Sequence, residues 1–492
     1  MKNKLLITLF LTCCLSAATD KNIAFAGLTG LDNTTRYTPM NSESQAKKIK
    51  EPSVAGMFYS SDRDELLTQI DGFKNNSRNN YNVTTRAVIV PHAGLIYSGR
   101  LAYEGISQLD KNIKNIFIIA PAHRVGFEGI ALTSYDAWKT PLGTIDVNQD
   151  ITKEIVSKFG GKINDTPLAP EHAIEVEIPF VQTLYQNVKV IPILVGKESP
   201  DKIFKIISHY YKDSNNGFII SSDLSHYLPD EKAKKVDAYT AQLIETGVCD
   251  NFAHELACGA TGIAGLLQFA NDKNYSLIRI DMSNSSSTTF DRNSVVGYGC
   301  WFLYEGERND FIKKYYSDFV LDLCRKSIKN KSLDISKMVY PQVFSEYGAT
   351  FVTLEKNGNL RGCIGSIIPH KTLIEDLVSN AKNSAYSDPR FNPVEKNEIK
   401  DLSIAVSLLS IPKPMTFKNE EDLLNQIREN VDGIIIRDND YQAVYLPSVW
   451  EQIPNKKDFL NSLKVKAGLP PNHFSKTFQA YRFETVYIKG GK

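Results

Sequence analysis

The sequence predicts an α/β protein of two consecutive domains, a three-layer domain followed by a smaller α+β domain. Up to about residue 305, short runs rich in Val, Ile and Phe alternate with helical patterns, which indicates βαβ units around a buried parallel sheet. Beyond that point the pattern changes to one long helix and two hairpins. The length of 492 residues also exceeds what one core usually supports.

The first domain is expected to span residues 51–305, and a charged stretch at 305–314 marks its end. Its expected strands are Ala87–Val90, Ile116–Ala120, Val190–Val195, Phe218–Ser221 and Val295–Tyr304. Its expected helices are Ser61–Phe73, Ile174–Tyr185, Lys232–Thr246 and Cys258–Ala270. Strands and helices in this alternation predict helices on both faces of the sheet.

The second domain is expected at 306–492 and begins with the helix Asp310–Lys329. Two hairpins are predicted, with turns at 357–359 and 438–440, because Asn-Gly and Asp-Asn pairs interrupt apolar alternation there. Further helices are expected at Leu373–Ala385 and Phe459–Ala467.

Three of the apolar runs lead to a histidine: AVIVPH ends at His92, IFIIAPAH at His123 and GFIISSDLSH at His226. Ligands of open α/β sheets bind beyond the carboxyl ends of the strands, so these imidazoles are expected to share one crevice. A single histidine is more often structural, but three in the same relation to their strands favour a metal site or an acid–base site.

Other side chains are candidates for the same crevice. Cys258 stands at the start of a predicted helix, where the dipole favours a thiolate ligand, although a free cysteine is usually a small buried apolar residue. Asp223 precedes His226 by three residues and is expected to orient it and raise its basicity. His172 lies among acidic residues, which indicates either a second acid–base group or a solvated helix start.

Residues 1–26 resemble a signal peptide, with Lys2 and Lys4 ahead of an apolar run and small residues after it. This predicts an exported or periplasmic protein; the alternative is a wrongly assigned start before a cytoplasmic one. Residues 27–50 read as a linker, and no later stretch predicts a membrane span. The net charge of +1 gives nucleic-acid binding no support, and the scattered cysteines indicate no disulfide framework.

The first domain resembles the Memo family through EPSVAGMFY, PHAGLIYSG, APAH, TPLGTIDVN, EHAIEVEIPF, SSDLSHY and ACGATGIAGLL, which occur in this order. The resemblance implies a fold similar to the class III extradiol dioxygenases and a metal site formed by His92, His123 and Cys258. Asp223, His226 and His172 would line the same pocket as catalytic candidates. A thiolate in place of the carboxylate of extradiol enzymes is a softer ligand that favours copper or zinc, and it argues against ring cleavage. The family resemblance implies copper or iron, with zinc as another option.

The second domain resembles the AMMECR family through LRGCIGS and AYSDPRFNPV. Together the two domains resemble components of the AmmeMemoRadiSam system, which implies a radical S-adenosylmethionine (SAM) protein as a partner; that partner fits a cytoplasmic location. Arg361 next to Cys363 suggests a reactive thiolate, whereas the strand-like alternation suggests close packing. Arg361 and Arg390 could jointly bind an anion or form structural ion pairs.

Three functions are compatible with these observations. The first is a metal-dependent oxidoreductase that uses copper or iron on an unknown small-molecule or peptide substrate. The second is a non-catalytic module that binds an anionic peptide or metabolite in the histidine-lined pocket. The third is a metal-handling protein whose cargo is the ion itself.

Overall fold

The computed structural model describes residues 46–78, 81–250 and 252–490. The signal-peptide-like segment at 1–26 and nearly all of the expected linker lie outside these residues. Ordered structure begins slightly before the expected position, since β1 (Ile49–Lys50) already pairs with β5 (Ala137–Thr140). With β6 (Gly143–Asp146), these strands form a small separate sheet.

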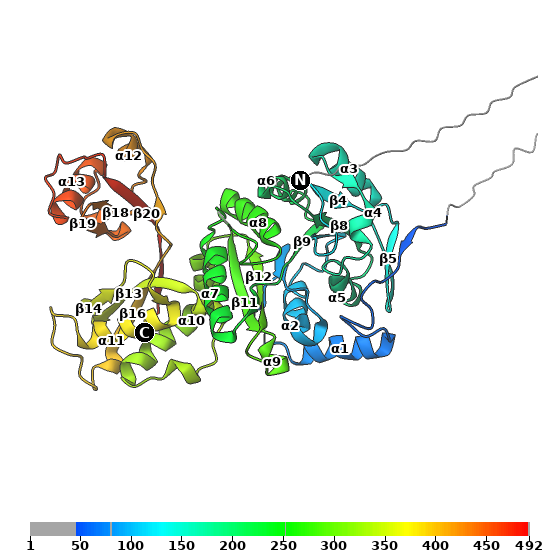
Figure 1. Cartoon of the computed structure of the whole chain (residues 1–492). Coiled ribbons are helices and arrows are strands. Elements are labelled where there is room, and N and C mark those ends of the chain that lie inside the picture. The colour runs from blue at the N-terminus through cyan, green and yellow to red at the C-terminus, as the bar shows by residue number, and fades with distance from the viewer. Residues whose placement is uncertain (1–45, 79–80, 251, 491–492) are drawn as a thin grey trace, which may run out of the picture. The chain divides into compact units, whose positions relative to one another are not determined.

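The first domain is built on a nine-stranded sheet in the order β10-β12-β2-β9-β3-β8-β4-β7, with β11 also paired to β12 (Figure 1). Its centre is parallel, because β2, β9, β3 and β8 run in the same direction, whereas β12 and β4 are antiparallel to their neighbours β2 and β8. The strands are β2 (Ala87–Val90), β3 (Asn115–Pro121), β4 (Ile130–Leu132), β7 (Lys162–Ile163), β8 (Lys189–Val195), β9 (Asn216–Ser221), β10 (His226–Leu228), β11 (Ser276–Asn284) and β12 (Val295–Tyr304).

The central strands are mostly apolar because both faces of the sheet are covered. Val88 and Val90 of β2 belong to one buried cluster, and Ala87 and Ile89 belong to another. The first cluster is completed by α1 (Arg63–Asn75), α2 (Leu95–Ile106) and α5 (Ile178–Leu184). The second is completed by α3 (Gln149–Phe159), α6 (Pro200–Tyr210), α7 (Asp230–Thr246) and α8 (Ala260–Lys273). The predicted three-layer architecture is therefore confirmed.

The packing of α2 on the sheet depends on Gly105. A Cβ at this position would lie 2.4 Å from Val90 Cγ1 and 2.6 Å from Cys300 Sγ. The helix backbone therefore approaches the strands more closely than any side chain would allow. This close contact holds the carboxyl-terminal end of α2 against β2 and β12.

One expected helix is divided in the structure. The segment Ile174–Tyr185 was expected to be continuous, but it forms a 3-10 turn, η1 (Glu175–Glu177), followed by α5. Pro179 lies in the first turn of α5 and has no N–H to donate to the turn before it, so the α-helical ladder starts only around this residue. Two short helices, α4 (Asp165–Leu168) and α9 (Ser286–Thr289), complete the domain.

The second domain contains two sheets. One has the order β14-β13-β16-β21, with β15 also paired to β13, and the other has the order β17-β20-β18-β19. Its strands are β13 (Tyr347–Lys356), β14 (Asn359–Gly365), β15 (Lys371–Thr372), β16 (Leu402–Leu409), β17 (Lys413–Pro414), β18 (Gly433–Asp438), β19 (Tyr441–Tyr445), β20 (Gln479–Phe483) and β21 (Thr485–Lys489). The helices are α10 (Arg308–Lys329), α11 (Leu373–Tyr386), α12 (Glu420–Gln426) and α13 (Lys456–Lys466).

Both predicted hairpins are present. Asn357 and Gly358 connect β13 to β14 with φ values of 53° and 81°, the left-handed conformation that an Asn-Gly hairpin turn requires. The second hairpin joins β18 to β19 at Asn439, whose φ is 51°. Short 3-10 turns occur at η2 (Ile335–Lys337), η3 (Gln342–Ser345), η4 (Ile399–Asp401) and η5 (Pro447–Glu451).

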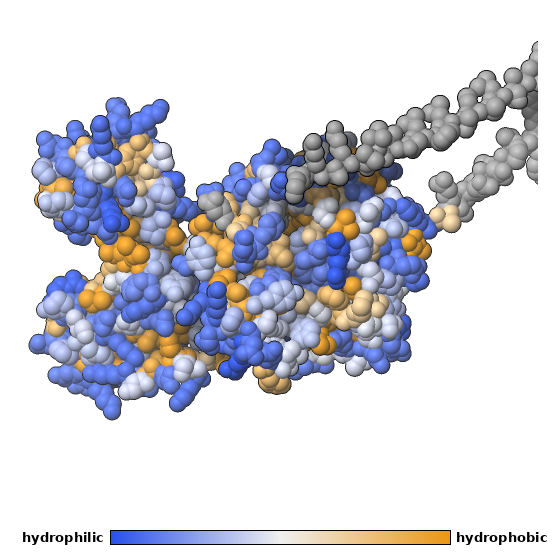
Figure 2. Space-filling model, viewed as in Figure 1, coloured by the Kyte–Doolittle hydropathy of each residue, from blue (hydrophilic) through white to orange (hydrophobic). Residues whose placement is uncertain are grey.

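The surface is mostly hydrophilic in the view of Figure 2, where apolar residues occur in small groups. Within the ranges that the structure describes, no helix combines the length and apolar character needed to cross a membrane.

Candidate metal centre

The strand-end histidines lie at one edge of the sheet. β2, β9 and β3 are adjacent and parallel, with Val90 opposite Ser221 and Ile119 opposite Ile220. His92 follows β2 by two residues and His123 follows β3 by two residues, so both imidazoles leave the same carboxyl edge. The backbone therefore produces the expected convergence for His92 and His123, two of the three histidines for which it was predicted.

Three imidazoles come together at this edge. The ring centroids of His92 and His123 are 5.0 Å apart, and the ring of His172 lies 5.5 Å from His92 and 4.7 Å from His123. One nitrogen from each ring lies within 4.8 Å of the other two, a separation that one metal ion could bridge. His172, expected from the sequence only as an acid–base group, is therefore also a possible ligand.

Cys258 is part of the same cluster. Its Sγ lies 3.4 Å from His92 Nε2 and accepts a hydrogen bond of 3.2 Å from the backbone N–H of Asp223. The residue lies just before α8, as expected, but the thiol is not the stabilised thiolate that a helix start suggests. Burial raises the pKa of Cys258 far above its usual value, and the nearby Asp223 carboxylate raises it further. Ligation therefore requires a metal ion to displace the thiol proton.

The chemistry of this donor set suits a transition metal. Burial lowers the pKa of His92 well below its usual value, and repulsion from His123 and His172 lowers it further, so the ring is neutral and able to coordinate. Neutral imidazoles with one thiolate match the preferences of copper, iron and zinc better than those of magnesium or calcium. The residues present therefore fit the metal that the sequence predicted.

Glu171 orients one side of the cluster. Its Oε2 accepts from the backbone N–H of His123 at 2.7 Å, and its Oε1 lies 3.0 Å from His123 Nδ1. His172 Nδ1 also lies 3.0 Å from Oε1, but at an angle that makes no hydrogen bond. Burial alone would raise the pKa of Glu171; the two imidazoles outweigh burial and hold the pKa far below its usual value. A charged carboxylate therefore fixes His123 with Nε2 free.

Asp223 and His226 border the cluster without binding each other. Asp223 Oδ1 accepts from the backbone N–H of His92 at 2.9 Å, and among the hydrogen bonds of the described residues none joins Asp223 to the His226 ring. The expected orienting contact is thus absent there, because the carboxylate is used to fix the backbone after β2. Burial raises the pKa of Asp223 to about 7 and lowers the pKa of His226. The raised pKa lets Asp223 exchange a proton near neutral pH, whereas the lowered pKa of His226 favours its neutral form.

The second-domain candidates lie near each other but are internally paired. Arg361 Nη2 lies 3.1 Å from Glu398 Oε2, and Arg390 Nη2 lies 2.7 Å from Asp388 Oδ2. The Cys363 backbone N–H donates to Asp388 at 2.8 Å, and its Sγ accepts from Thr353 Oγ1 at 3.4 Å. These contacts favour the structural interpretation of both arginines over joint anion binding.

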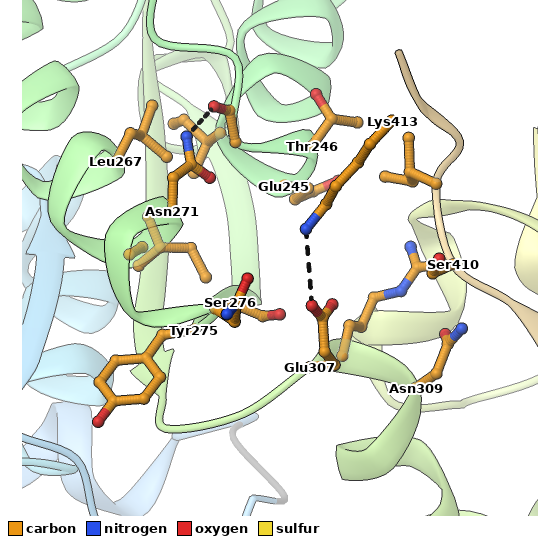
Figure 3. A pocket seen from close by; sticks show the side chains of 17 residues that line it. Glu245, Thr246, Leu267, Asn271, Tyr275, Ser276, Glu307, Asn309, Ser410 and Lys413 are labelled. Carbon is orange, nitrogen blue, oxygen red and sulfur yellow. Dashed lines mark hydrogen bonds and ion pairs between the residues drawn. The ribbon is translucent and has the colours of Figure 1, made fainter. Parts of the chain in front are cut away.

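A cavity elsewhere has a different character (Figure 3). It is lined in part by Glu245, Asn271, Glu307 and Lys413. Lys413 Nζ lies 3.7 Å from Glu307 Oε1, and Asn271 Nδ2 donates to the Gly247 carbonyl at 2.7 Å. These polar groups are paired within the protein, whereas Asn309 Oδ1, which also lines the cavity, has no hydrogen-bond partner among the described residues. No group of metal-ligand atoms like the histidine cluster faces the cavity in the part of the chain that is described.

Comparison with known proteins identifies both domains. Residues 50–302 match the family of Memo-like proteins, and residues 321–488 match the AMMECR1 family. The class of protein defined by the fold and the crevice is thus a Memo-like α/β domain fused to an AMMECR1 domain. The chain belongs to the Memo family.

Individual relatives match one domain or the other. A MEMO1 family protein of Aquifex aeolicus is 30% identical over 274 residues, which is 52% of this chain and 100% of the relative. One from Thermoplasma volcanium is 32% identical over 263 residues, covering 51% of this chain and 96% of the relative. A solved structure of an uncharacterized Pyrococcus horikoshii protein is 30% identical and covers 35% of this chain and 89% of that one, with a TM-score of 0.31.

Proposed function

We propose that this chain binds a copper or iron ion through His92, His123 and Cys258 and uses it for redox chemistry on an organic substrate. The observation that carries the proposal is the convergence of ligand atoms, with imidazole nitrogens of His92, His123 and His172 within 4.8 Å of one another and Cys258 Sγ 3.4 Å from His92 Nε2. His172 is the natural fourth ligand, since its ring adjoins the other two.

The protein groups around the site have separate tasks in this proposal. Glu171 holds the ring of His123, and Asp223 holds the backbone of His92. His226 supplies or removes a proton at the substrate, because burial leaves it neutral at physiological pH. A bound copper or iron ion would supply one-electron chemistry, which none of these side chains can provide alone.

Elemental analysis of matched variants tests the ligand set. We expect His92→Ala, His123→Ala and Cys258→Ser each to lower the bound copper or iron sharply, with unchanged circular dichroism. His209→Ala and Cys249→Ser are the controls, because these residues are a half-exposed histidine and a half-buried free cysteine outside the cluster. Full metal occupancy in all three ligand variants would contradict the proposed site. If Cys258→Ser alone retained its metal, His172 rather than the Cys258 thiol would be the third ligand.

His226 separates binding from reaction. We expect His226→Ala to keep its metal but to lose most of its oxygen consumption with ascorbate as the reductant, since acid–base groups contribute about 100- to 10,000-fold. Loss of metal in this variant would make His226 a ligand instead.

Two expectations about the cellular setting belong to the same proposal. A radical SAM protein is the proposed partner, on the basis of the family resemblance, and co-purification from the native source tests it. Export is proposed from the character of residues 1–26. Sequencing of the mature amino terminus tests export, since a retained Met1 in a cytoplasmic fraction would refute it.

A further inference from the structure

A buried serine hydroxyl connects His92 to the carboxyl group of Glu177, which has no other hydrogen-bond partner within the described part of the chain. Ser221, the last residue of β9, has its Oγ 2.7 Å from His92 Nδ1, 2.7 Å from the Ala173 carbonyl oxygen and 3.0 Å from Glu177 Oε1. Ser221 and Glu177 have no exposed surface, and His92 is 1% exposed. Bulk solvent therefore does not reach this group.

The three neighbours determine where the protons lie. A hydroxyl donates one hydrogen bond and accepts two. The Ala173 carbonyl can only accept, so it takes the Ser221 proton. The other two neighbours must then donate, which places a proton on His92 Nδ1 and a proton on the Glu177 carboxyl.

An ionised Glu177 would not fit this arrangement. Two acceptors would compete for the single Ser221 proton, and a buried charge would remain with Oε2 unpartnered. The charged group that acts on Glu177 is Asp223, which is also acidic. Burial raises the pKa of Glu177 well above its usual value, opposed by the Ser221 hydrogen bond and reinforced by Asp223, in agreement with the proton accounting.

We propose that Glu177, as a neutral carboxylic acid, is a positioning residue that acts through Ser221 to hold His92 as its Nδ1–H tautomer, with Nε2 bare and directed at the metal site. The inference rests on the proposed metal centre, and the 3.4 Å between Nε2 and Cys258 Sγ is the contact that this tautomer serves. The two strand-end ligands are then held differently. A charged Glu171 fixes His123, whereas a neutral chain of hydrogen bonds from Glu177 through Ser221, here called the relay, fixes His92.

Three variants test the relay. Glu177→Gln keeps a donor toward Ser221, Glu177→Met removes it at similar volume, and Ser221→Ala removes the acceptor for His92. The first readout is the tautomer of His92 in the metal-free protein, observed by NMR of ¹⁵N-histidine and assigned by the loss of its signal in His92→Ala. The second is the affinity for Zn²⁺, measured by competition with a chelator.

We expect the Nδ1–H tautomer in the wild type and in Glu177→Gln, with similar Zn²⁺ affinity in both. Glu177→Met and Ser221→Ala should show mixed tautomers and an affinity lower by about 10- to 100-fold, the usual cost of removing a partner behind a ligand. An equal loss of Zn²⁺ affinity in Glu177→Gln and Glu177→Met would overturn the inference, and so would an Nε2–H tautomer of His92 in the wild type. Absence of Zn²⁺ binding by the wild type would instead refute the metal centre, while the tautomer readout still decides the relay.

Discussion

The histidine crevice of the first domain and the Arg361–Cys363–Arg390 region of the second are both rich in reactive side chains, but their polar groups are used in opposite ways. At the sheet edge, ring nitrogens of three histidines lie close together, and His172 Nδ1 has no hydrogen-bond partner among the residues that the structure describes. In the second region each guanidinium is bound to a carboxylate. Ligand atoms that lie close together without hydrogen-bond partners indicate a site for a bound ion or ligand. Charged side chains that pair with each other indicate a structural role.

The largest effect expected in the second region is steric. A Cβ at Gly362 would lie 2.0 Å from the backbone oxygen of Ser384, which cannot move aside without shifting α11. We expect Gly362→Ala to destabilise the protein by about 3 kcal/mol or to prevent folding of this domain. Urea unfolding measures the loss, and Gly72→Ala is the control because nothing lies within 4 Å of its added Cβ. Unchanged stability of Gly362→Ala would contradict the packing role of the motif.

A smaller effect concerns pH and the ion pair of Arg361. The hydrogen bond from Arg361, with those from the Glu395 backbone and Lys356, lowers the pKa of Glu398 to about 2. A carboxylate with a lowered pKa stabilises the fold above its unfolded pKa of about 4.3. That contribution is lost as the pH falls through about 2. We therefore expect Glu398→Gln to flatten the acid side of the stability profile, measured by urea unfolding from pH 6 to 3.

Glu395→Gln is the control for that profile, since Glu395 is an exposed carboxylate on the same loop. Equal slopes for the wild type and Glu398→Gln would show that Arg361 is available for other ligands.

The smallest effect is expected at Cys363. Its Sγ accepts a weak hydrogen bond from Thr353 Oγ1 at 3.4 Å and also interacts with the Arg390 guanidinium, while its backbone N–H donates to Asp388. We expect Cys363→Ala to cost about 1 kcal/mol or less and to leave metal content unchanged, in contrast to Cys258→Ser. If Cys363→Ala lost oxygen consumption while its metal site stayed fully occupied, Cys363 of the second domain would take part in the reaction.

The sequence predicted the architecture well because the decisive signals are local. Apolar runs of four to seven residues in β2, β3 and β9 indicate buried strands. Because ligands bind beyond the carboxyl ends of parallel strands, the sequence alone predicts that His92 and His123 lie close together. The Asn357-Gly358 pair fixed a hairpin for the same reason, since the required backbone conformation is a property of those two residues.

The remaining features depend on tertiary structure. Ser221 and Glu177 are 44 residues apart, and only the fold brings them within hydrogen-bond distance. The ligand-like position of His172 depends on tertiary contacts of its segment, such as the hydrogen bond from Ser221 Oγ of β9 to the Ala173 carbonyl. The state of Cys258 was expected from the helix dipole alone, but the cost of burying a thiolate is larger. Burial is the quantity that local sequence patterns report least well.

Co²⁺ substitution tests the central claim, a mixed histidine and cysteine metal centre, most directly. A Co²⁺ ion bound by a thiolate has a sulfur-to-cobalt charge-transfer band in the near ultraviolet, which nitrogen ligands alone do not produce. We expect this band in the wild type and in Cys363→Ser, its loss in Cys258→Ser, and loss of Co²⁺ binding in His92→Ala. A fully loaded wild-type protein without the band, or a band that persists in Cys258→Ser, would contradict the assignment of Cys258 to the metal centre.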